Sequence, residues 1–245
     1  MAKTSSTKKK TKKKAPAKET WRKRQAKRLR RILFRGAIWS FSLFIFAILA
    51  FTLFNPPTTW TMQSEKARLG RLDHQWVPIE EIAPVMARSV VAAEDANFCD
   101  HWGFDVNAIR AAIEEGGSRG ASTISQQVVK NVYLWQGRSW VRKALETAIT
   151  PFVEMAWSKR RIVEVYLNIA EFDEGVFGVE AAARHYFGVG PEALSASQAA
   201  RLAMVLPNPR GRSASRPTSA QIKRASSIID GAATIDKDGR ADCFQ

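Results

Sequence analysis

Two adjacent carboxylates, Glu94 and Asp95, follow an apolar stretch in the segment EEIAPVMARSVVAAED (80–95). Met86 and Val90 lie eight and four residues before Glu94, so in a helix these three side chains share one face. A carboxyl group on an apolar face, near the negative end of the helix dipole, is poorly solvated and has the raised pKa that a general base needs. A buried structural glutamate that bonds a backbone amide or an arginine is the alternative.

A second group of charged residues lies between 130 and 146. Lys130, Arg138, Arg142 and Lys143 are cationic, and Glu146 follows them. Arg138, Arg142 and Glu146 recur at intervals of four, so they share one face of a helix. Guanidinium and ammonium groups in such a stripe suit a phosphorylated ligand. A surface ladder of salt bridges is the alternative.

The sequence has no pattern that predicts a metal site. His74, His101 and His185 lack the spacing of metal ligands, so a catalytic zinc is not expected. No cofactor is required by the sequence.

Helices are expected to position both charged groups, because the pattern after the first 75 residues is helical almost throughout, with no run of alternating strand. GGSRGAST (116–123) is a Gly-rich loop that leads into a capping box formed by Thr123 and Gln126. A helix beginning near Ser139 carries the basic stripe, and Pro151 is expected to kink or restart it. Further helices are expected over 159–168, before Gly188, after the capping box of Ser195 and Gln198, and over 220–230.

Positive charge is concentrated at the N-terminus. Residues 1–35 hold 16 of the 38 Lys and Arg residues and one of the 23 acidic residues, which leaves 22 of each sign elsewhere. The body of the protein is neutral, so the net charge of +15 does not predict a nucleic-acid partner. We expect the basic tail to be solvated and without a fold.

The segment GAIWSFSLFIFAILAFTLF (36–54) carries no charged residue. A helix of this length spans roughly 28 Å, which is about the hydrocarbon core of a bilayer. It continues into Asn55, Pro56 and Pro57 rather than a small-residue cleavage site, which favours an uncleaved anchor over a signal peptide. By the positive-inside rule the N-terminus is expected in the cytoplasm and the body outside it.

The chain has two cysteines, Cys99 and Cys243. A compartment outside the cytoplasm permits a disulfide, and we hypothesise one that docks the C-terminal tail onto the segment of Glu94 and Asp95. Two isolated buried thiols are the alternative.

Four motifs, in order, resemble those of the peptidoglycan glycosyltransferases of family 51. The first to fourth are EDANFCDHWGFD (94–105), GASTISQQVVKN (120–131), RKALE (142–146) and KRRIVEVYLN (159–168). FGVEAAARHYFG (177–188) and LSASQAARLAMVLPNP (194–209) are similar to the regions that follow. The resemblance covers about residues 76–210, and since only a few dozen residues follow, the monofunctional biosynthetic form is the closest match. Cys99 is not a general feature of the family.

The resemblance implies an all-α, lysozyme-like domain that polymerises lipid II into β-1,4-linked glycan strands, with inversion and release of polyprenyl diphosphate. Glu94 matches the general base, and Glu146 matches a second catalytic glutamate that helps to hold the donor pyrophosphate with its cations. The positions expected to bind the diphosphate are Lys130, Arg138, Arg142 and Lys143. The positions expected to contact the sugars are Ser122, Thr123, Gln126 and Gln127, and Asp95 is expected to bind the substrate.

The chemistry agrees with this resemblance. A glycosidase protonates a poor leaving group and needs a carboxylic acid beside a second carboxylate. Pyrophosphate leaves as a stable anion and needs charge stabilisation, for which one base and a basic stripe are suited. A lytic enzyme on the same scaffold and a non-catalytic scaffold of the cell-wall machinery are the rival interpretations.

The expected organisation follows from these segments: a basic cytoplasmic tail (1–35), a transmembrane helix (36–55), a juxtamembrane linker (56–75), a glycosyltransferase domain (76–232) and a C-terminal tail (233–245). The expected location is a bacterial inner membrane, spanned once, with the catalytic domain in the periplasm. Expected partners are lipid II, the growing glycan strand, the plasma membrane and proteins of the cell-wall or division machinery. A divalent cation, Mg²⁺ or Mn²⁺, is compatible with the reaction.

Overall fold

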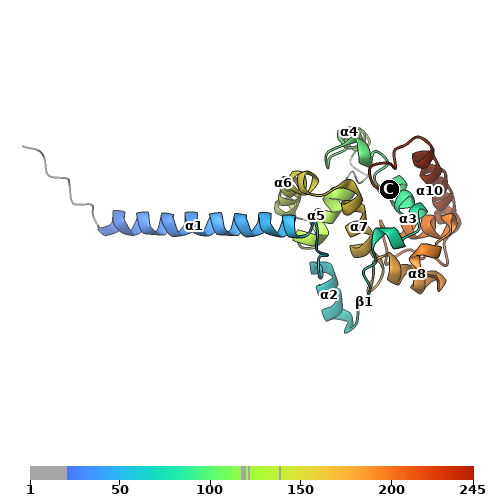
Figure 1. Cartoon of the computed structure of the whole chain (residues 1–245), viewed down its shortest axis with the longest axis horizontal. Coiled ribbons are helices and arrows are strands. Elements are labelled where there is room, and N and C mark those ends of the chain that lie inside the picture. The colour runs from blue at the N-terminus through green and yellow to red at the C-terminus, as the bar shows by residue number, and fades with distance from the viewer. Residues whose placement is uncertain (1–20, 117–119, 121, 138) are drawn as a thin grey trace, which may run out of the picture. The chain divides into compact units, whose positions relative to one another are not determined.

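The computed structural model of this chain describes residues 21–116, 120, 122–137 and 139–245 (Figure 1). Two compact units are distinguished by their internal contacts: one ends at Ala47, and the other extends from Ile48 to Gln245. Helices dominate the described part of each unit, which confirms the all-α prediction.

Helix α1 extends without a break over Trp21–Ala50. The prediction of a basic tail without a fold is therefore wrong for residues 21–35, and the helix ends at Ala50 rather than at 55. Lys, Arg, Leu and Ala are strong helix formers, and an adjoining apolar helix supplies the nucleus from which further turns propagate. Among the described residues, α1 is the one helix long and apolar enough to cross a membrane, over Lys23–Ala50. The first twenty residues lie outside the described part of the chain.

The segment predicted as a linker, 56–75, contains α2 (Trp60–Leu69) and β1 (Asp73–His74). The hydroxyl oxygen of Thr59 accepts a hydrogen bond from the Met62 amide at 3.2 Å and caps α2. Met62 is 2% exposed, so α2 is packed into the domain. Sequence periodicity did not predict this helix because it is only ten residues long and mixes polar with apolar side chains.

The other α-helices are α3 (Pro84–Glu94), α4 (Val106–Glu114), α5 (Ile124–Tyr133), α6 (Trp140–Ala156), α7 (Lys159–Ile169), α8 (Val179–Phe187), α9 (Ala196–Val205) and α10 (Ser219–Lys237). Short 3₁₀ helices cover Ile79–Glu81, Phe98–Asp100 and Pro191–Ala193. β3 (Val176–Phe177) pairs in parallel with β1 and antiparallel with β2 (Glu171–Asp173).

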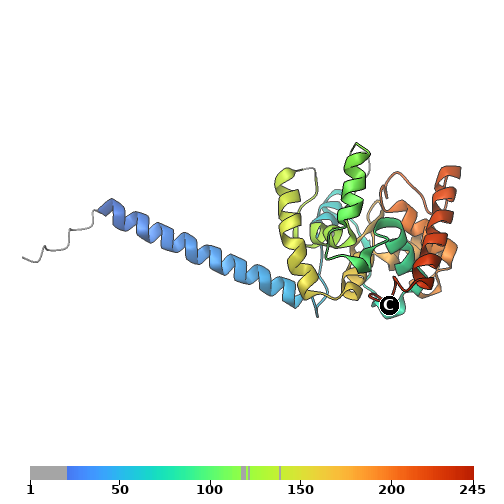
Figure 2. The ribbon, with the colours of Figure 1, turned by 90° about the horizontal axis from the view of Figure 1, so that it is seen from above.

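Helices α3 and α5 lie at the centre of the unit that follows Ala47. α5 packs against α6 and α7, whereas α3 packs against α9 and α10. Figures 1 and 2 show α6 and α10 on opposite sides of this unit. The end of α3, which carries Glu94, meets the start of α5, where the amide of Ile124 donates to Asp95 at 3.0 Å. The packing therefore brings the first two sequence motifs together.

The capping boxes predicted at Thr123 and Ser195 are both present, and a third, at Thr218, begins α10. Pro151 does not restart the helix, because α6 continues through it to Ala156; the predicted kink stays a prediction. Proline removes one backbone hydrogen bond, but the side chains on either side of it, Thr150 and Val153, are fully buried and hold the helix in place.

Candidate active site

Glu94 is the last residue of α3, and its half-buried side chain lines a cavity of about 240 Å³. Asp95, Ser122, Thr123 and Arg224 line the same cavity. The side-chain amide of Gln127, on α5, donates to Glu94 Oε2 at 2.9 Å. Glu94 is therefore both held in one orientation and open to a small molecule.

Burial raises the pKa of Glu94, as the sequence pattern suggested. The hydrogen bond from Gln127 and the charges of Arg224 and Lys130 act in the opposite direction on this pKa, while Asp95 adds to the rise. A carboxylate that is poorly solvated but faced by cations has the properties of a general base near neutral pH.

Asp95, although adjacent to Glu94, has a different environment. It is 7% exposed, its Oδ1 lies 2.8 Å from His101 Nε2, and its Oδ2 accepts from the Ile124 amide. Both oxygens are thus bonded within the protein, which favours a structural role over the substrate contact expected for Asp95. The helical pattern placed Glu94 deeper than Asp95, but the chain leaves the helix after Glu94 and turns Asp95 inward.

We expect Asp95→Asn to lower the free energy of unfolding by about 2 to 3 kcal/mol, because it weakens two hydrogen bonds to a buried carboxylate. Urea denaturation followed by circular dichroism measures this change. Asp100→Asn, at an exposed aspartate of the same segment, is the control and should stay within about 0.5 kcal/mol of the unsubstituted protein. Equal stability of the two variants would contradict the structural role.

Two of the residues expected to contact sugars have their side chains committed to the start of α5. Thr123 and Gln126 are 2% and 4% exposed and bond each other's backbone amides in the capping box. The Thr123 hydroxyl also donates to the Gly103 carbonyl at 2.7 Å. Thr123 borders the cavity beside Glu94, but its hydroxyl is already engaged in hydrogen bonds within the protein. Ser122, in contrast, is exposed and lines that cavity.

Gln127 is bonded to Glu94 and lines a second cavity. Its Oε1 accepts a hydrogen bond from the buried Tyr166 hydroxyl at 3.3 Å while its amide donates to Glu94. Gln127, Lys130 and Tyr166 line this second cavity, which has a volume of about 160 Å³. Glu94 therefore lines the first cavity and is hydrogen-bonded to Gln127, which lines the second.

Glu146, on α6, is the anionic centre of the basic group. It is 3% exposed, and its two oxygens pair with Arg142 Nη1 at 2.8 Å and with Lys143 Nζ at 2.5 Å. Lys143 also donates to Ser122 at 3.0 Å, and Arg142 Nε donates to the Gly137 carbonyl at 2.9 Å. The Glu146 carboxylate thus holds Arg142 and Lys143 in place, between the loop that precedes α5 and the loop that precedes α6. Arg138 lies outside the described residues.

Lys130 faces the same group from α5. Burial lowers the pKa of its ammonium group, and the negative charge of Glu146 is the main effect that opposes this shift. Arg142 and Lys143 lower the pKa further, while Glu94 raises it. Three of the four predicted cations are therefore gathered around one glutamate, and their combined positive charge suits a diphosphate.

In the part of the chain that the structure describes, no group of three or more His, Cys, Asp or Glu side chains could hold a metal ion. Both oxygens of Glu146 are already paired with cationic side chains. The divalent cation that the sequence leaves open stays a prediction.

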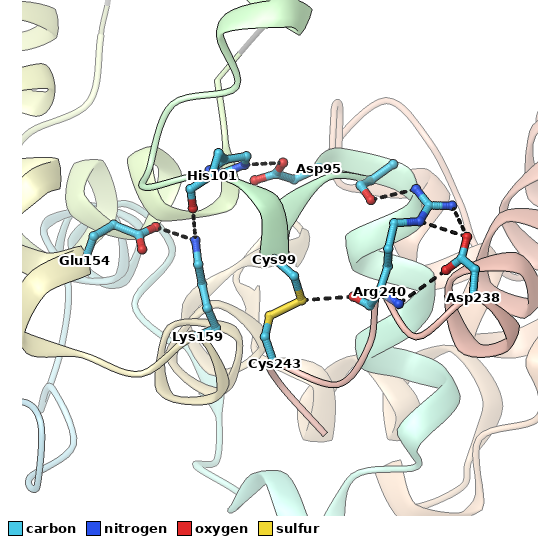
Figure 3. Close-up of a disulfide and its surroundings, with 9 residues drawn as sticks. Asp95, Cys99, His101, Glu154, Lys159, Asp238, Arg240 and Cys243 are labelled. Carbon is cyan, nitrogen blue, oxygen red and sulfur yellow. Dashed lines mark hydrogen bonds and ion pairs between the residues drawn. A yellow bond between two sulfur atoms is a disulfide. The ribbon is translucent and has the colours of Figure 1, made fainter.

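Cys99 and Cys243 are joined in a disulfide, with their Cα atoms 5.8 Å apart (Figure 3). The bond ties the end of the chain to the 3₁₀ turn that follows Asp95. Residues 233–245 are therefore not a loose tail: α10 continues to Lys237, and Phe244 is 1% exposed.

Reduction of this disulfide should destabilise the domain by about 5 kcal/mol on the chain-entropy account, because the bond closes a long loop of 144 residues. Thermal unfolding with and without a phosphine reductant measures the effect. A double Cys99→Ser, Cys243→Ser variant should unfold at the temperature of the reduced protein, and the reductant should not change its melting temperature. A melting temperature unchanged by complete reduction would contradict the prediction.

Sequence reasoning missed two residues of the site. Arg224 comes from α10, 130 residues after Glu94, and no local pattern links it to the first motif. Tyr166 lies in the fourth motif, where the sequence pattern is that of an ordinary buried helix position. In the structure its hydroxyl donates a hydrogen bond to Gln127. Only the packing of α10 against α3 and of α7 against α5 reveals these contacts.

Comparison with known proteins agrees with this geometry. The family described as Transglycosylase matches residues 62–233, so the matched region begins within α2 rather than at 76. A biosynthetic peptidoglycan transglycosylase of Jannaschia sp. (strain CCS1) is 59% identical over 219 residues, which cover 89% of this chain and 92% of the relative. Proteins of the same name from Yersinia pestis (strain Pestoides F) and Yersinia pseudotuberculosis serotype I (strain IP32953) are each 48% identical over 207 residues, covering 79% of this chain and 83% of the relative. By this coverage and identity, the chain belongs to the transglycosylase family.

Proposed function

We propose that this protein is a peptidoglycan glycosyltransferase that polymerises lipid II into glycan strands. Its relatives carry the name biosynthetic peptidoglycan transglycosylase. The observation that carries the proposal is the placing of Glu94 in a cavity, hydrogen-bonded to a residue of a second cavity, with a cluster of cations around Glu146 on the neighbouring helices. One base and several cations are the groups that displacement of a diphosphate requires.

In the proposed reaction, Glu94 accepts the proton of the 4-hydroxyl group of the acceptor sugar. The hydroxyl oxygen forms a bond to the anomeric carbon of the donor, and the bond from that carbon to the diphosphate oxygen breaks. The electron pair leaves with polyprenyl diphosphate, and attack from the opposite face inverts the configuration to β. Gln127 holds the carboxylate of Glu94 in place through its hydrogen bond.

Lys130, Arg142 and Lys143 are proposed to bind the diphosphate and to stabilise the charge that develops on it. Glu146 positions Arg142 and Lys143 rather than reacting itself, because both of its oxygens are paired. Ser122 is in contact with Lys143 and with the Glu94 cavity, so it is placed to contact the sugar next to the diphosphate. Arg138 is proposed as a further cation from its position in the sequence alone, four residues before Arg142.

A lipid-linked substrate agrees with the surface of α6. Trp140, Val141 and Met155 on this helix are 91%, 65% and 71% exposed. Large exposed apolar side chains on the helix that carries Arg142, Lys143 and Glu146 suit a diphosphate that is attached to a polyprenyl chain at a membrane surface.

The test is incubation of the purified full chain, in detergent, with labelled lipid II. We expect long polymers that a muramidase digests to disaccharide units. A parallel incubation with isolated glycan strands tests for lytic cleavage, which we do not expect. Strand cleavage without polymer formation would support the lytic alternative, and inactivity on both substrates would support a non-catalytic scaffold.

The membrane topology is a further proposal. Helix α1 fits a membrane anchor by length and composition. The basic residues on its N-terminal side support a cytoplasmic N-terminus and a periplasmic domain at the inner membrane. A phosphatase reporter that requires the periplasm, fused after Gln245, should be active, and a fluorescent reporter that folds only in the cytoplasm should be dark. The reverse pattern would overturn this orientation.

A further inference from the structure

The segment that carries Glu94 and Asp95 is contacted along its length by the C-terminal part of the chain. Arg224 Nη2 donates to the Ala93 carbonyl at 3.0 Å. Arg240 Nη1 donates to the Ala96 carbonyl at 3.1 Å. Cys243 is bonded to Cys99 (Figure 3). We call residues 224–243 the C-terminal clamp, because they hold the segment Ala93–Cys99 near its start, its middle and its end.

The clamp is attached to α3 by close packing as well as by these bonds. α10 buries Ala225, Ile228, Ala232 and Ile235 on the face that it presents to the domain. A Cβ atom at Gly231 would lie 3.2 Å from the Cβ atom of Ala92, so the two helices are in near contact two residues before Glu94. This packing fixes the distance from the start of α10, where Arg224 lies, to the catalytic end of α3.

The far end of the clamp is fixed independently. The Arg240 guanidinium is oriented by Asp238, to which Nη2 donates at 2.7 Å (Figure 3). Phe244 is 1% exposed, and its ring lies 6.3 Å from that of the buried Phe98, between Glu94 and Cys99 in the first motif. Arg240 and Cys243 lie beyond residue 233, where the family match ends.

We propose that the C-terminal clamp is a positioning element for the catalytic base, in which Arg224 orients and electrostatically supports Glu94 and the Cys99–Cys243 disulfide holds the clamp in place. This inference rests on the proposed role of Glu94 as the base. The physical reason is that Glu94 is the last residue of its helix and an irregular segment follows it. If the segment Ala93–Cys99 moves, the carboxylate of Glu94 moves with it and leaves the position that catalysis requires.

Arg224 differs from the other contacts because it also faces the charge of Glu94. The groups around that carboxylate are Gln127 and Lys130 from α5, Tyr166 from α7, Arg224 from α10 and the neighbouring Asp95. Of these, Arg224 and Lys130 are the cations that lower the pKa of Glu94 against the effect of burial. Removal of Arg224 therefore raises that pKa, and a higher pH is needed to form the active carboxylate.

The test compares pH profiles of lipid II polymerisation for the full chain and for Arg224→Met. We expect the midpoint of the acidic limb to move up by about half a pH unit and kcat on the plateau to fall by about fivefold, with KM within about twofold. Arg224→Lys should return the midpoint toward that of the unsubstituted chain. Lys223→Met, which removes a neighbouring exposed cation of α10, is the matched control and should change neither quantity. An Arg224→Met profile that is lowered evenly, without a shift of the midpoint, would overturn the electrostatic role of Arg224.

The disulfide is tested on the same assay. Full reduction, verified by mass after alkylation of two thiols, should lower kcat by roughly fivefold at a temperature where circular dichroism shows the domain to be folded. The double Cys99→Ser, Cys243→Ser variant should have this lower kcat with or without reductant. A reduced protein with the kcat of the oxidised one would overturn the clamp.

The Glu94→Gln variant distinguishes failure of this proposal from failure of the proposed function. If Glu94→Gln polymerises lipid II at the normal rate, the base is misassigned. If Glu94→Gln is inactive and Arg224→Met behaves normally, only the clamp is wrong.

Discussion

Replacement of Glu94 by Gln is expected to lower the rate of lipid II polymerisation by roughly 10² to 10⁴ while binding of lipid II changes little. Glutamine has nearly the same shape as glutamate, and it can still accept the hydrogen bond that Gln127 donates to the carboxylate. What it lacks is the basicity to accept a proton from the acceptor hydroxyl. The loss therefore falls on kcat, measured by the initial rate with saturating labelled lipid II.

The pH dependence provides a second measurement on the same residue. Burial raises the pKa of Glu94, and only the ionised form is a base, so the rate of the unsubstituted protein should rise with pH through this pKa. This rise of the rate with pH, the acidic limb of the profile, should be absent from the residual rate of Glu94→Gln. Glu81→Gln, at an exposed glutamate just before α3, is the control and should keep both the rate and the limb. A Glu94→Gln variant with a normal rate would show that another group is the base.

Replacement of Glu146 by Gln should lower turnover by roughly 10²-fold for a different reason. Glu146 holds Arg142 and Lys143 through its two oxygens, and the neutral amide leaves these cations and Lys130 mutually repelling and less well oriented. Because the cations are proposed to contact the diphosphate in both ground and transition states, KM for lipid II should rise as kcat falls. The acidic limb should persist, since Glu94 is intact.

Stability provides the matched comparison for Glu146. The substitution should lower the free energy of unfolding by about 2 kcal/mol, because charged hydrogen bonds of a buried carboxylate are lost while its partners retain some contact with water. Glu180, 4% exposed and paired with Arg184 one turn later on α8, offers an equivalent pair away from the basic cluster. Glu180→Gln should lose similar stability but keep its turnover, and equal losses of turnover in both variants would remove Glu146 from the site.

The amino-acid sequence by itself determined the features that depend on neighbours along the chain. The helical period placed Glu94 at a poorly solvated helix end, and the capping signals at Thr123 and Ser195 placed the starts of α5 and α9 correctly. The spacing of Arg142 and Glu146 allowed an ion pair one helical turn long, given as the alternative to a ligand-binding stripe, and the structure contains this pair. These properties follow from interactions within a few residues, which is why the pattern alone was sufficient.

Tertiary structure alone decided which of these side chains are available to a ligand. Asp95, Thr123 and Gln126 carry polar groups in the right motifs, but packing turns them inward and occupies their hydrogen bonds. Arg224 has no motif of its own, and it joins the site because α10 packs on α3. The physical reason is that burial and long-range pairing depend on the whole packed chain: a carboxylate in a cavity and one bonded to a backbone amide have the same neighbours in sequence, and only the fold distinguishes them.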